Sequence, residues 1–222
     1  MPRKHRLQTP PLAAIYTELY QAWGPQHWWP ARTRFEMIVG AILTQNTAWS
    51  NVERALSRLR KVGALRPATL HHASIETIAE WIRPSGYYNM KAKRLKAFTT
   101  LLFEQFDGKL NRLFALETAA LRQILLDVNG IGPETADSIL LYAAQRSQFV
   151  IDAYTKRFLV RHNWINPSAT YDDIAALFHR QLPPDVPHYN EYHALIVYLG
   201  KTYCRTKPDC ANCPLRHRLP RS

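Results

Sequence analysis

The stretch from Ala119 to Phe158 constrains the fold more than any other part of the chain, because it predicts two short helices joined by a tight turn. Asn129, Gly130 and Gly132 adopt positive φ at little cost, and Pro133 suits the first turn of a helix. Apolar residues recur at helical spacing before and after this turn, at Leu121, Ile124, Leu125, Val128, Ile139, Leu140 and Ala143. A turn that opens a helix presents backbone N–H groups at the positive helix end, so we expect it to bind a phosphate.

The charge balance indicates a polyanionic partner. The 222 residues include 29 Lys and Arg against 17 Asp and Glu, which gives a formal net charge of +12. There is no long amphipathic basic helix and no lipidation motif, so nucleic acid is favoured over a membrane surface. A generally basic protein is the alternative, since charge alone does not exclude it. The chain has neither a secretory leader pattern nor an apolar run of about eighteen residues, so we expect a cytoplasmic protein without a membrane partner.

Helical periodicity extends along the chain, and no strand pattern or internal repeat accompanies it. The expected helices outside the hairpin are 12–23, 35–43, 52–62, 75–82, 95–106, 154–164, 175–182 and 191–203. The continuous apolar run of residues 35–43 predicts a buried helix. The fold class is therefore predicted to be all-α.

Two patterns together resemble a known family. V-x-G-I-G-x-x-T-A-D in the hairpin and V-I-D-A-Y beyond it are similar to the helix-hairpin-helix and trailing aspartate of the endonuclease III-like DNA glycosylases. The hairpin alone also occurs in DNA-binding proteins without catalysis, so its combination with the aspartate carries the resemblance. The resemblance implies two helical domains with a DNA-binding cleft between them. These are a middle domain of residues 30–140 and a discontinuous domain of residues 1–29 with 141–222, which carries a C-terminal cysteine loop.

The chemistry of the resembling family points to Asp152. Breaking an N-glycosidic bond builds positive charge on the sugar, so a carboxylate beside C1′ is an economical catalyst. Asp152 also stands where a helix N-cap would, and the two roles are compatible. Bifunctional family members carry a lysine two residues after the second glycine of the hairpin, where this chain has Glu134. A carboxylate cannot form an imine, so strand cleavage should be absent or feeble, with Lys156 as the one nearby alternative amine.

The resemblance also implies the residues that contact DNA. Gln45, in L-T-Q-N-T, would fill the gap that a flipped base leaves, and the backbone of Gly130, Ile131 and Gly132 would hold a phosphate. Further phosphate candidates follow a G-x-Y-x-x-K-A turn and are Lys91, Lys93 and Arg94. The alternatives are a structural hydrogen-bonding role for Gln45 and an ordinary solvated face for the basic residues.

The aromatic residues narrow the resemblance to the endonuclease III-type 3-methyladenine DNA glycosylases. The residues that line the base pocket in that subgroup correspond in this chain to Trp28, Trp29, Pro30 and Trp49. The alternative is a loop that fills the core. A cationic N3-alkylated adenine stacks well on electron-rich rings. We therefore expect a monomeric, monofunctional DNA N-glycosylase of base excision repair that acts on double-stranded DNA with a damaged base or abasic site. The alternatives are an endonuclease III-like enzyme for oxidised pyrimidines, with weak or no lyase activity, and a damaged-DNA binding protein without catalysis.

The three cysteines, Cys204, Cys210 and Cys213, are too few and too close together for a disulfide framework. They resemble the family loop C-x6-C-x2-C-x5-C, which holds a [4Fe–4S] cluster. This chain has one residue fewer in the first gap, and Leu219 stands at the fourth ligand position. A cluster would need another ligand, for which His217 is a candidate, and the same residues could bind zinc. The alternative is a degenerate loop that keeps the fold without metal.

Overall fold

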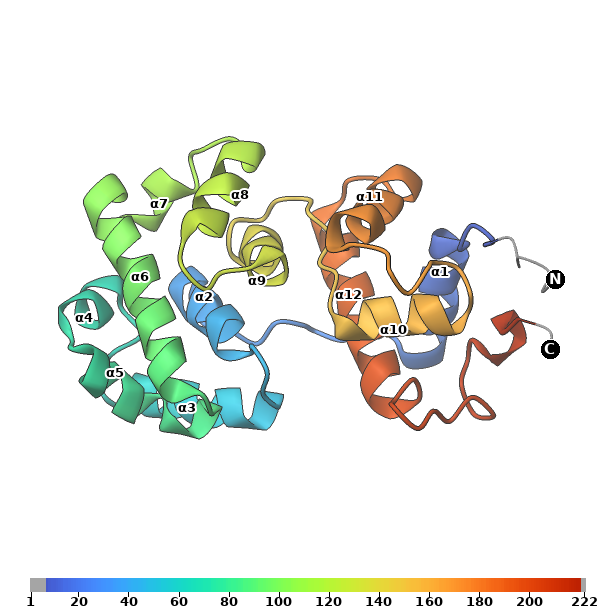
Figure 1. Ribbon diagram of the computed structural model, residues 1–222, viewed down its shortest axis with the longest axis horizontal. Helices are drawn as coiled ribbons and strands as arrows, with labels where there is room; N and C mark the ends of the chain where they lie inside the picture. Colours follow the sequence, from blue (N-terminus) through green and yellow to red (C-terminus); the bar gives the residue numbers. More distant parts are fainter. Residues whose placement is uncertain (1–6, 221–222) are drawn as a thin grey trace. The chain divides into compact units, whose positions relative to one another are not determined.

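The computed structural model describes residues 7–220, and within that span it contains helices and connecting loops but no strand (Figure 1). The all-α prediction is therefore confirmed. The chain divides into two compact units, residues 29–146 and residues 1–28 with 147–222. The sequence predicts these boundaries after residues 29 and 140, whereas the structure has them after residues 28 and 146. No helix among the described residues has both the length and the apolar composition that crossing a membrane requires.

The middle unit, residues 29–146, packs around a nearly buried helix. Its helices are α2 (Arg34–Leu43), α3 (Trp49–Lys61), α4 (Pro67–His72), α5 (Ile75–Trp81), the 3-10 turn η1 (Arg83–Ser85), α6 (Tyr88–Phe106), α7 (Leu110–Leu113), α8 (Thr118–Asp127), α9 (Pro133–Ser138) and the π-helical turn η2 (Ile139–Ala143). α2 contacts α3, α6, α9 and η2, and Ile38, Ile42 and Leu43 are fully buried. The predicted burial of this apolar run is confirmed.

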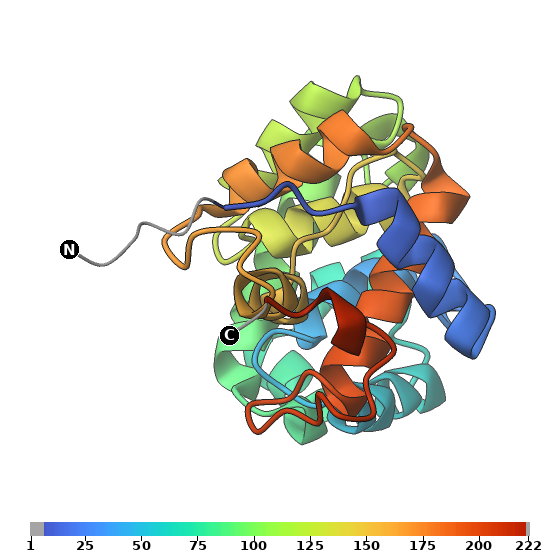
Figure 2. The same cartoon turned by 90° about the vertical axis from the view of Figure 1, so that its right-hand side faces the viewer.

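The second unit joins the two ends of the chain. Its helices are α1 (Leu12–Trp23), α10 (Ala153–Arg161), α11 (Tyr171–Gln181), α12 (Val186–Thr202) and the 3-10 turn η3 (Arg216–Arg218). α12 packs against α1 and α10, so residues far apart in sequence share one core (Figure 2). The hydroxyl of Tyr192 donates to the carbonyl of Leu12 across 2.9 Å, and Arg218 Nε donates to Glu18 at 2.9 Å.

Several helices differ from the sequence prediction, because α3, α6, α11 and α12 begin three to seven residues before their expected starts. α6 begins at Tyr88, several residues before the expected start, because Tyr87 takes a left-handed conformation (φ +46°) and turns the chain directly into the helix. α4 and α7 were not predicted, since helices of six and four residues are too short to show a periodic apolar face.

Candidate functional site

The hairpin between α8 and α9 is a tight turn with exposed glycine backbone. Gly130 has φ +87°, whereas the side chain of Ile131 is buried in the core of the middle unit. Gly132 is the N-cap of α9, with Pro133 as the first helical residue. The amide of Ile131 already donates to the carbonyl of Val128 at 3.0 Å. The turn therefore offers the exposed backbone of Gly130 and Gly132 to a ligand, and Ile131 anchors it.

A buried ion pair fixes the two helices of the hairpin to each other. Arg122, on α8, donates from Nε to Oδ1 of Asp137 at 2.7 Å, and Asp137 is fully buried on α9. A buried carboxylate is stabilised by such a partner because isolation would leave its charge uncompensated. The pair holds the turn in the orientation set by its glycines.

Gln45 is bound to this hairpin rather than free in solvent. Its Nε2 donates to the carbonyl of Gly130 at 3.0 Å and to Oγ1 of Thr135 at 2.9 Å, and its Oε1 accepts from Arg94. The next residue, Asn46, is exposed and has φ +52°. The structure thus brings together three predicted DNA contacts, namely Gln45, Gly130 and Arg94, and places Asn46 at the tip of the loop.

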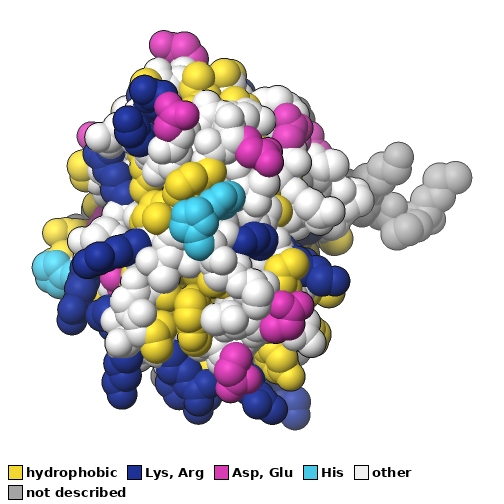
Figure 3. Space-filling model, turned by 90° about the vertical axis from the view of Figure 1, so that its left-hand side faces the viewer, with side chains coloured by type: hydrophobic (Ala, Val, Ile, Leu, Met, Phe, Trp, Pro, Cys, Tyr) yellow, Lys and Arg dark blue, Asp and Glu magenta, His cyan; other side chains and the backbone are white. Residues whose placement is uncertain are grey.

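The basic residues predicted to bind phosphate have different surroundings. Lys93 is exposed and Arg94 is half-buried, but Lys91 has 1% of its surface exposed. Its Nζ donates to the carbonyls of Leu43 and Ser85 at 2.9 and 2.7 Å, and burial with the nearby Arg94 charge lowers its pKa to about 8. These bonds join α6 to the end of α2 and occupy the Lys91 ammonium group, so they do not support the expected phosphate contact of this residue. Figure 3 shows one face of the molecule, where Lys and Arg side chains gather along the left and lower margins.

The aromatic residues expected to line one pocket come from both units. The Trp29 ring meets Trp49 edge-on at 5.0 Å between centroids and lies 5.3 Å from the Tyr142 ring, all within the middle unit. Trp28 belongs to the other unit, where Nζ of Lys201 lies 5.8 Å from its ring centroid. Pro30 is exposed. Tyr142 was not predicted as a member of this cluster, because its helical spacing fits an ordinary core position equally well.

Asp152 is a buried carboxylate at the N-terminus of α10. One oxygen, Oδ1, accepts hydrogen bonds from the amide and hydroxyl of Thr155 at 2.7 and 2.8 Å, so the residue is an N-cap as the sequence predicted. The other oxygen, Oδ2, lies 3.6 Å from Nε2 of His193, on α12. Burial opposes ionisation, but His193 and the Thr155 donors outweigh it and hold the pKa of Asp152 below its usual range.

The hairpin position that carries a lysine in bifunctional family members is occupied by a glutamate in this chain. Glu134 is exposed in the first turn of α9. The alternative amine, Lys156, donates from Nζ to the carbonyl of Ala169 at 2.8 Å. Lys156 is therefore engaged in holding the loop after α10.

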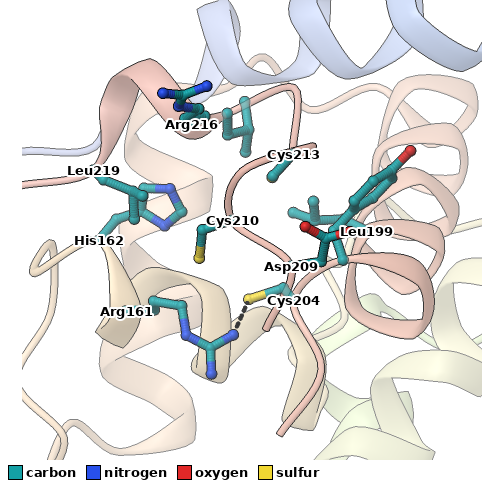
Figure 4. Close-up of a pocket in the computed structure, with 11 residues that line it drawn as sticks. Arg161, His162, Leu199, Cys204, Asp209, Cys210, Cys213, Arg216 and Leu219 are labelled. Atoms are coloured by element: carbon teal, nitrogen blue, oxygen red, sulfur yellow. Dashed lines mark hydrogen bonds between the residues drawn. The ribbon is translucent and has the colours of Figure 1, made fainter. Parts of the chain in front are cut away.

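The three cysteines line one pocket in the C-terminal loop, together with Arg161, His162 and Leu219 (Figure 4). Arg161 donates to Sγ of Cys204 at 2.9 Å, the contact drawn as a dashed line in Figure 4. Burial, with smaller contributions from the other two thiols, raises the pKa of Cys213. Among the residues that the structure describes, no three Cys, His, Asp or Glu side chains converge as ligands of a metal ion.

This ligand set does not fit a four-ligand [4Fe–4S] cluster. Leu219 offers no donor atom, and a guanidinium already occupies one thiol. His217 pairs with Glu18 at 3.4 Å, so the structure does not support it as the missing ligand. The loop has other supports, because Arg157 donates from Nε to the carbonyl of Cys204 at 2.6 Å.

Fold and geometry together define an all-helical protein with a helix-hairpin-helix turn and an ionised aspartate at a helix start. The family model for HhH-GPD superfamily base excision DNA repair proteins matches residues 39–184, and the chain belongs to this superfamily. It is a DNA glycosylase of the endonuclease III-like branch of base excision repair. The resemblance expected from the hairpin and Asp152 motifs is thereby confirmed.

Three known proteins are similar to it over most of their length. A candidate DNA repair glycosylase of Methanocaldococcus jannaschii is 48% identical over 204 residues, which cover 91% of this chain and 92% of the relative. Endonuclease III of Sulfolobus acidocaldarius is 31% identical over 186 residues, covering 83% and 81%. The crystal structure of the H. pylori 3-methyladenine DNA glycosylase bound to 1,N6-ethenoadenine is 28% identical with a TM-score of 0.73, covering 86% and 95%.

Proposed function

We propose that the protein is a monofunctional DNA N-glycosylase that removes a damaged base, in the first place an alkylated purine, by Asp152-assisted hydrolysis. The observation that carries the proposal is the Asp152 carboxylate. It is buried, ionised at neutral pH and held by the two Thr155 donors on one oxygen. A fixed negative charge of this kind stabilises the positive charge that grows on the deoxyribose and orients or deprotonates the attacking water.

The proposal that the base is removed by hydrolysis, without strand cleavage, rests on Glu134. Formation of a Schiff base requires an amine, and the side chain at this hairpin position is an exposed carboxylate. Lys156 is bound to the Ala169 carbonyl. The abasic product is therefore released with its strand intact.

The DNA contacts centre on the hairpin of the middle unit. Gly130 and Gly132 present backbone to a phosphate, and Lys93 and Arg94 add positive charge. Gln45 would have to give up three hydrogen bonds to enter a duplex. We assign that entry to the neighbouring Asn46, which is exposed at the loop tip, and give Gln45 the role of fixing the loop to the hairpin.

The base preference rests on the tryptophans. Trp29 and Trp49, both in the middle unit, are half-buried and perpendicular to each other. Electron-rich rings favour a cationic alkylated purine over a neutral oxidised pyrimidine. The similar H. pylori enzyme is named as a 3-methyladenine glycosylase, which agrees with this preference.

We propose that the cysteine loop keeps its shape without a cluster, since Arg157 and Arg161 hold Cys204 from α10. Iron and zinc analysis of protein purified without oxygen tests this. We expect neither metal in stoichiometric amount. We also expect no visible absorption band of the kind that iron–sulfur clusters show. Iron at cluster stoichiometry would contradict the proposal, and its loss in His162→Ala would identify the pocket histidine as the fourth ligand.

The functional proposal is tested by identifying the free bases released from duplex DNA. Duplex treated with a methylating agent is compared with thymine-glycol duplex, and strand scission is scored in parallel. Release of 3-methyladenine without scission is expected. Release of thymine glycol alone would overturn the base preference, and tight, salt-dependent binding without release of either base would favour the binding-protein alternative.

A further inference from the structure

We infer that His193 is a positioning residue for the reaction, which holds the Asp152 carboxylate in the orientation that the sugar cation requires. This inference rests on the proposed function, because it assigns the task of His193 through Asp152. It starts from an asymmetry between the two carboxylate oxygens. Oδ1 is occupied by Thr155, from the same helix, whereas Oδ2 faces His193 from α12 at 3.6 Å.

Asp152 and its two described partners are all buried. His193 has 6% of its surface exposed, Asp152 has 9%, and Thr155 is fully buried. From α11 the hydroxyl of Tyr171 accepts a hydrogen bond from the amide of Ile151 at 3.3 Å, one residue before the carboxylate. His193 thus faces the second oxygen of Asp152 from a neighbouring helix, and α10 packs directly on α12.

Thr155 and His193 contact different oxygens of the carboxylate, so together they define its orientation more fully than either contact alone. Thr155 fixes Oδ1 through two donors that belong to the helix cap, and an N-cap aspartate is satisfied by these alone. A helix cap therefore gives no reason for a buried imidazole at the second oxygen. A catalytic carboxylate does give one, since electrostatic stabilisation of a transition state depends on a charge that is already oriented.

His193 also affects the ionisation of Asp152. Burial alone would raise the pKa of Asp152, and the His193 contacts are the largest influences that lower it, followed by those of Thr155. Loss of the imidazole should therefore raise the pKa of Asp152 and move the acid limb of the pH profile for base release to higher pH.

The test compares His193→Ala and His193→Gln with wild type and with His188→Gln, a control on the same helix. Base release, binding of an abasic duplex and the carboxyl ¹³C titration of Asp152 are measured for each protein. Partners that orient a catalytic group typically contribute about ten- to hundred-fold, so we expect that loss in single-turnover base release for His193→Ala. His193→Gln, which keeps a donor, should recover part of the rate.

The outcomes separate the inference from the proposed function. We expect unchanged affinity for the abasic duplex and a higher titration midpoint of Asp152 in His193→Ala. Unaltered base release and titration in that variant would overturn the inference even if Asp152→Asn is inactive. Should wild type release no base, the proposed function fails, and the ¹³C titration still decides whether His193 controls Asp152. A fold defect is recognised by comparing the thermal unfolding of both His193 variants with that of His188→Gln.

Discussion

Nε2 of Gln45 donates a hydrogen bond to the carbonyl of Gly130 across 3.0 Å, which links the loop before α3 to the turn of the hairpin. The same amide reaches Thr135, in the first turn of α9. Gln45 therefore ties the loop to both the turn and the second helix of the hairpin. Gln45, which makes this bond, and the exposed Asn46 next to it should have separable roles.

Replacement of Asn46 or Gln45 by alanine tests those roles. Asn46→Ala removes the exposed tip and should weaken binding of a duplex with an abasic site about ten-fold, at little cost in stability. Gln45→Ala leaves the Arg94 and Thr135 partners unmatched and should lower the free energy of unfolding by about 1–3 kcal/mol. Fluorescence anisotropy and urea unfolding measure the two effects. Stronger loss of binding in Gln45→Ala, without destabilisation, would return the duplex-entering role to Gln45.

Gly130→Ala should destabilise the hairpin. The backbone has φ +87°, and a Cβ at this position would approach Cγ of Arg94 to 2.5 Å. Left-handed backbone alone costs a residue with a side chain about 1–3 kcal/mol, and the Arg94 contact adds to that cost. Gly132→Ala is the matched control, since its φ is −92° and a Cβ there would meet nothing within 4 Å. Equal stability of the two variants in urea unfolding would refute this explanation of Gly130.

Glu134→Lys should introduce the chemistry that the wild type lacks. A lysine in the first turn of α9 supplies the amine that bifunctional family members have at this hairpin position, and attack on C1′ then yields an imine. Borohydride trapping on damaged duplex should give a covalent adduct for Glu134→Lys and none for wild type or for Glu134→Gln. An adduct with the wild-type protein would show that another amine, such as Lys156, reaches the sugar.

Lys91 is predicted to stabilise the middle unit rather than bind DNA. Lys91→Met leaves the Leu43 and Ser85 carbonyls without their donor and should cost about 1–3 kcal/mol, whereas Lys93→Ala should mainly weaken DNA binding. The pKa of Lys91 is about 8 in the folded chain, against an ordinary value of 10.5. Between these two values the unfolded chain holds more protons, so stability gained through Lys91 increases as the pH rises.

The measurement is the difference in unfolding free energy between wild type and Lys91→Met across that pH range. This difference should be constant below about pH 8. Above that pH, the unfolding free energy of wild type should increase relative to that of Lys91→Met. A difference that does not change between pH 8 and 10.5 would show that Lys91 titrates normally.

The parts of the molecule that the sequence predicted well are those with local signals. Helical periodicity located α1 and α2 closely, and the glycines with Pro133 located the hairpin. The spacing of Asp152 before Thr155 is a cap pattern, so the N-cap role could be predicted from neighbouring residues. Each of these inferences depends on residues that are close together in the sequence.

The rest depends on contacts between distant residues, which leave no local pattern. Nothing in the local sequence distinguishes Lys91 from the nearby Lys93. Burial of the Lys91 ammonium group becomes evident only from the structure, where it donates to the Leu43 carbonyl. His193 lies on an apolar helix 41 residues after Asp152, and nothing in its spacing indicates that the two side chains meet. The same holds for Arg161 at Cys204, where packing of α10 decides the contact.

The most direct test of the whole account is the release of 3-methyladenine from methylated duplex by wild type and by Asp152→Asn. The amide keeps the shape of the carboxylate but removes its charge, so base release should fall at least about a hundred-fold. Binding of an abasic duplex should remain within a factor of about two, since Asp152 stabilises a transient cation and not the product. Equal base release by the two proteins would contradict the account, and so would an absence of release by wild-type protein that binds the duplex.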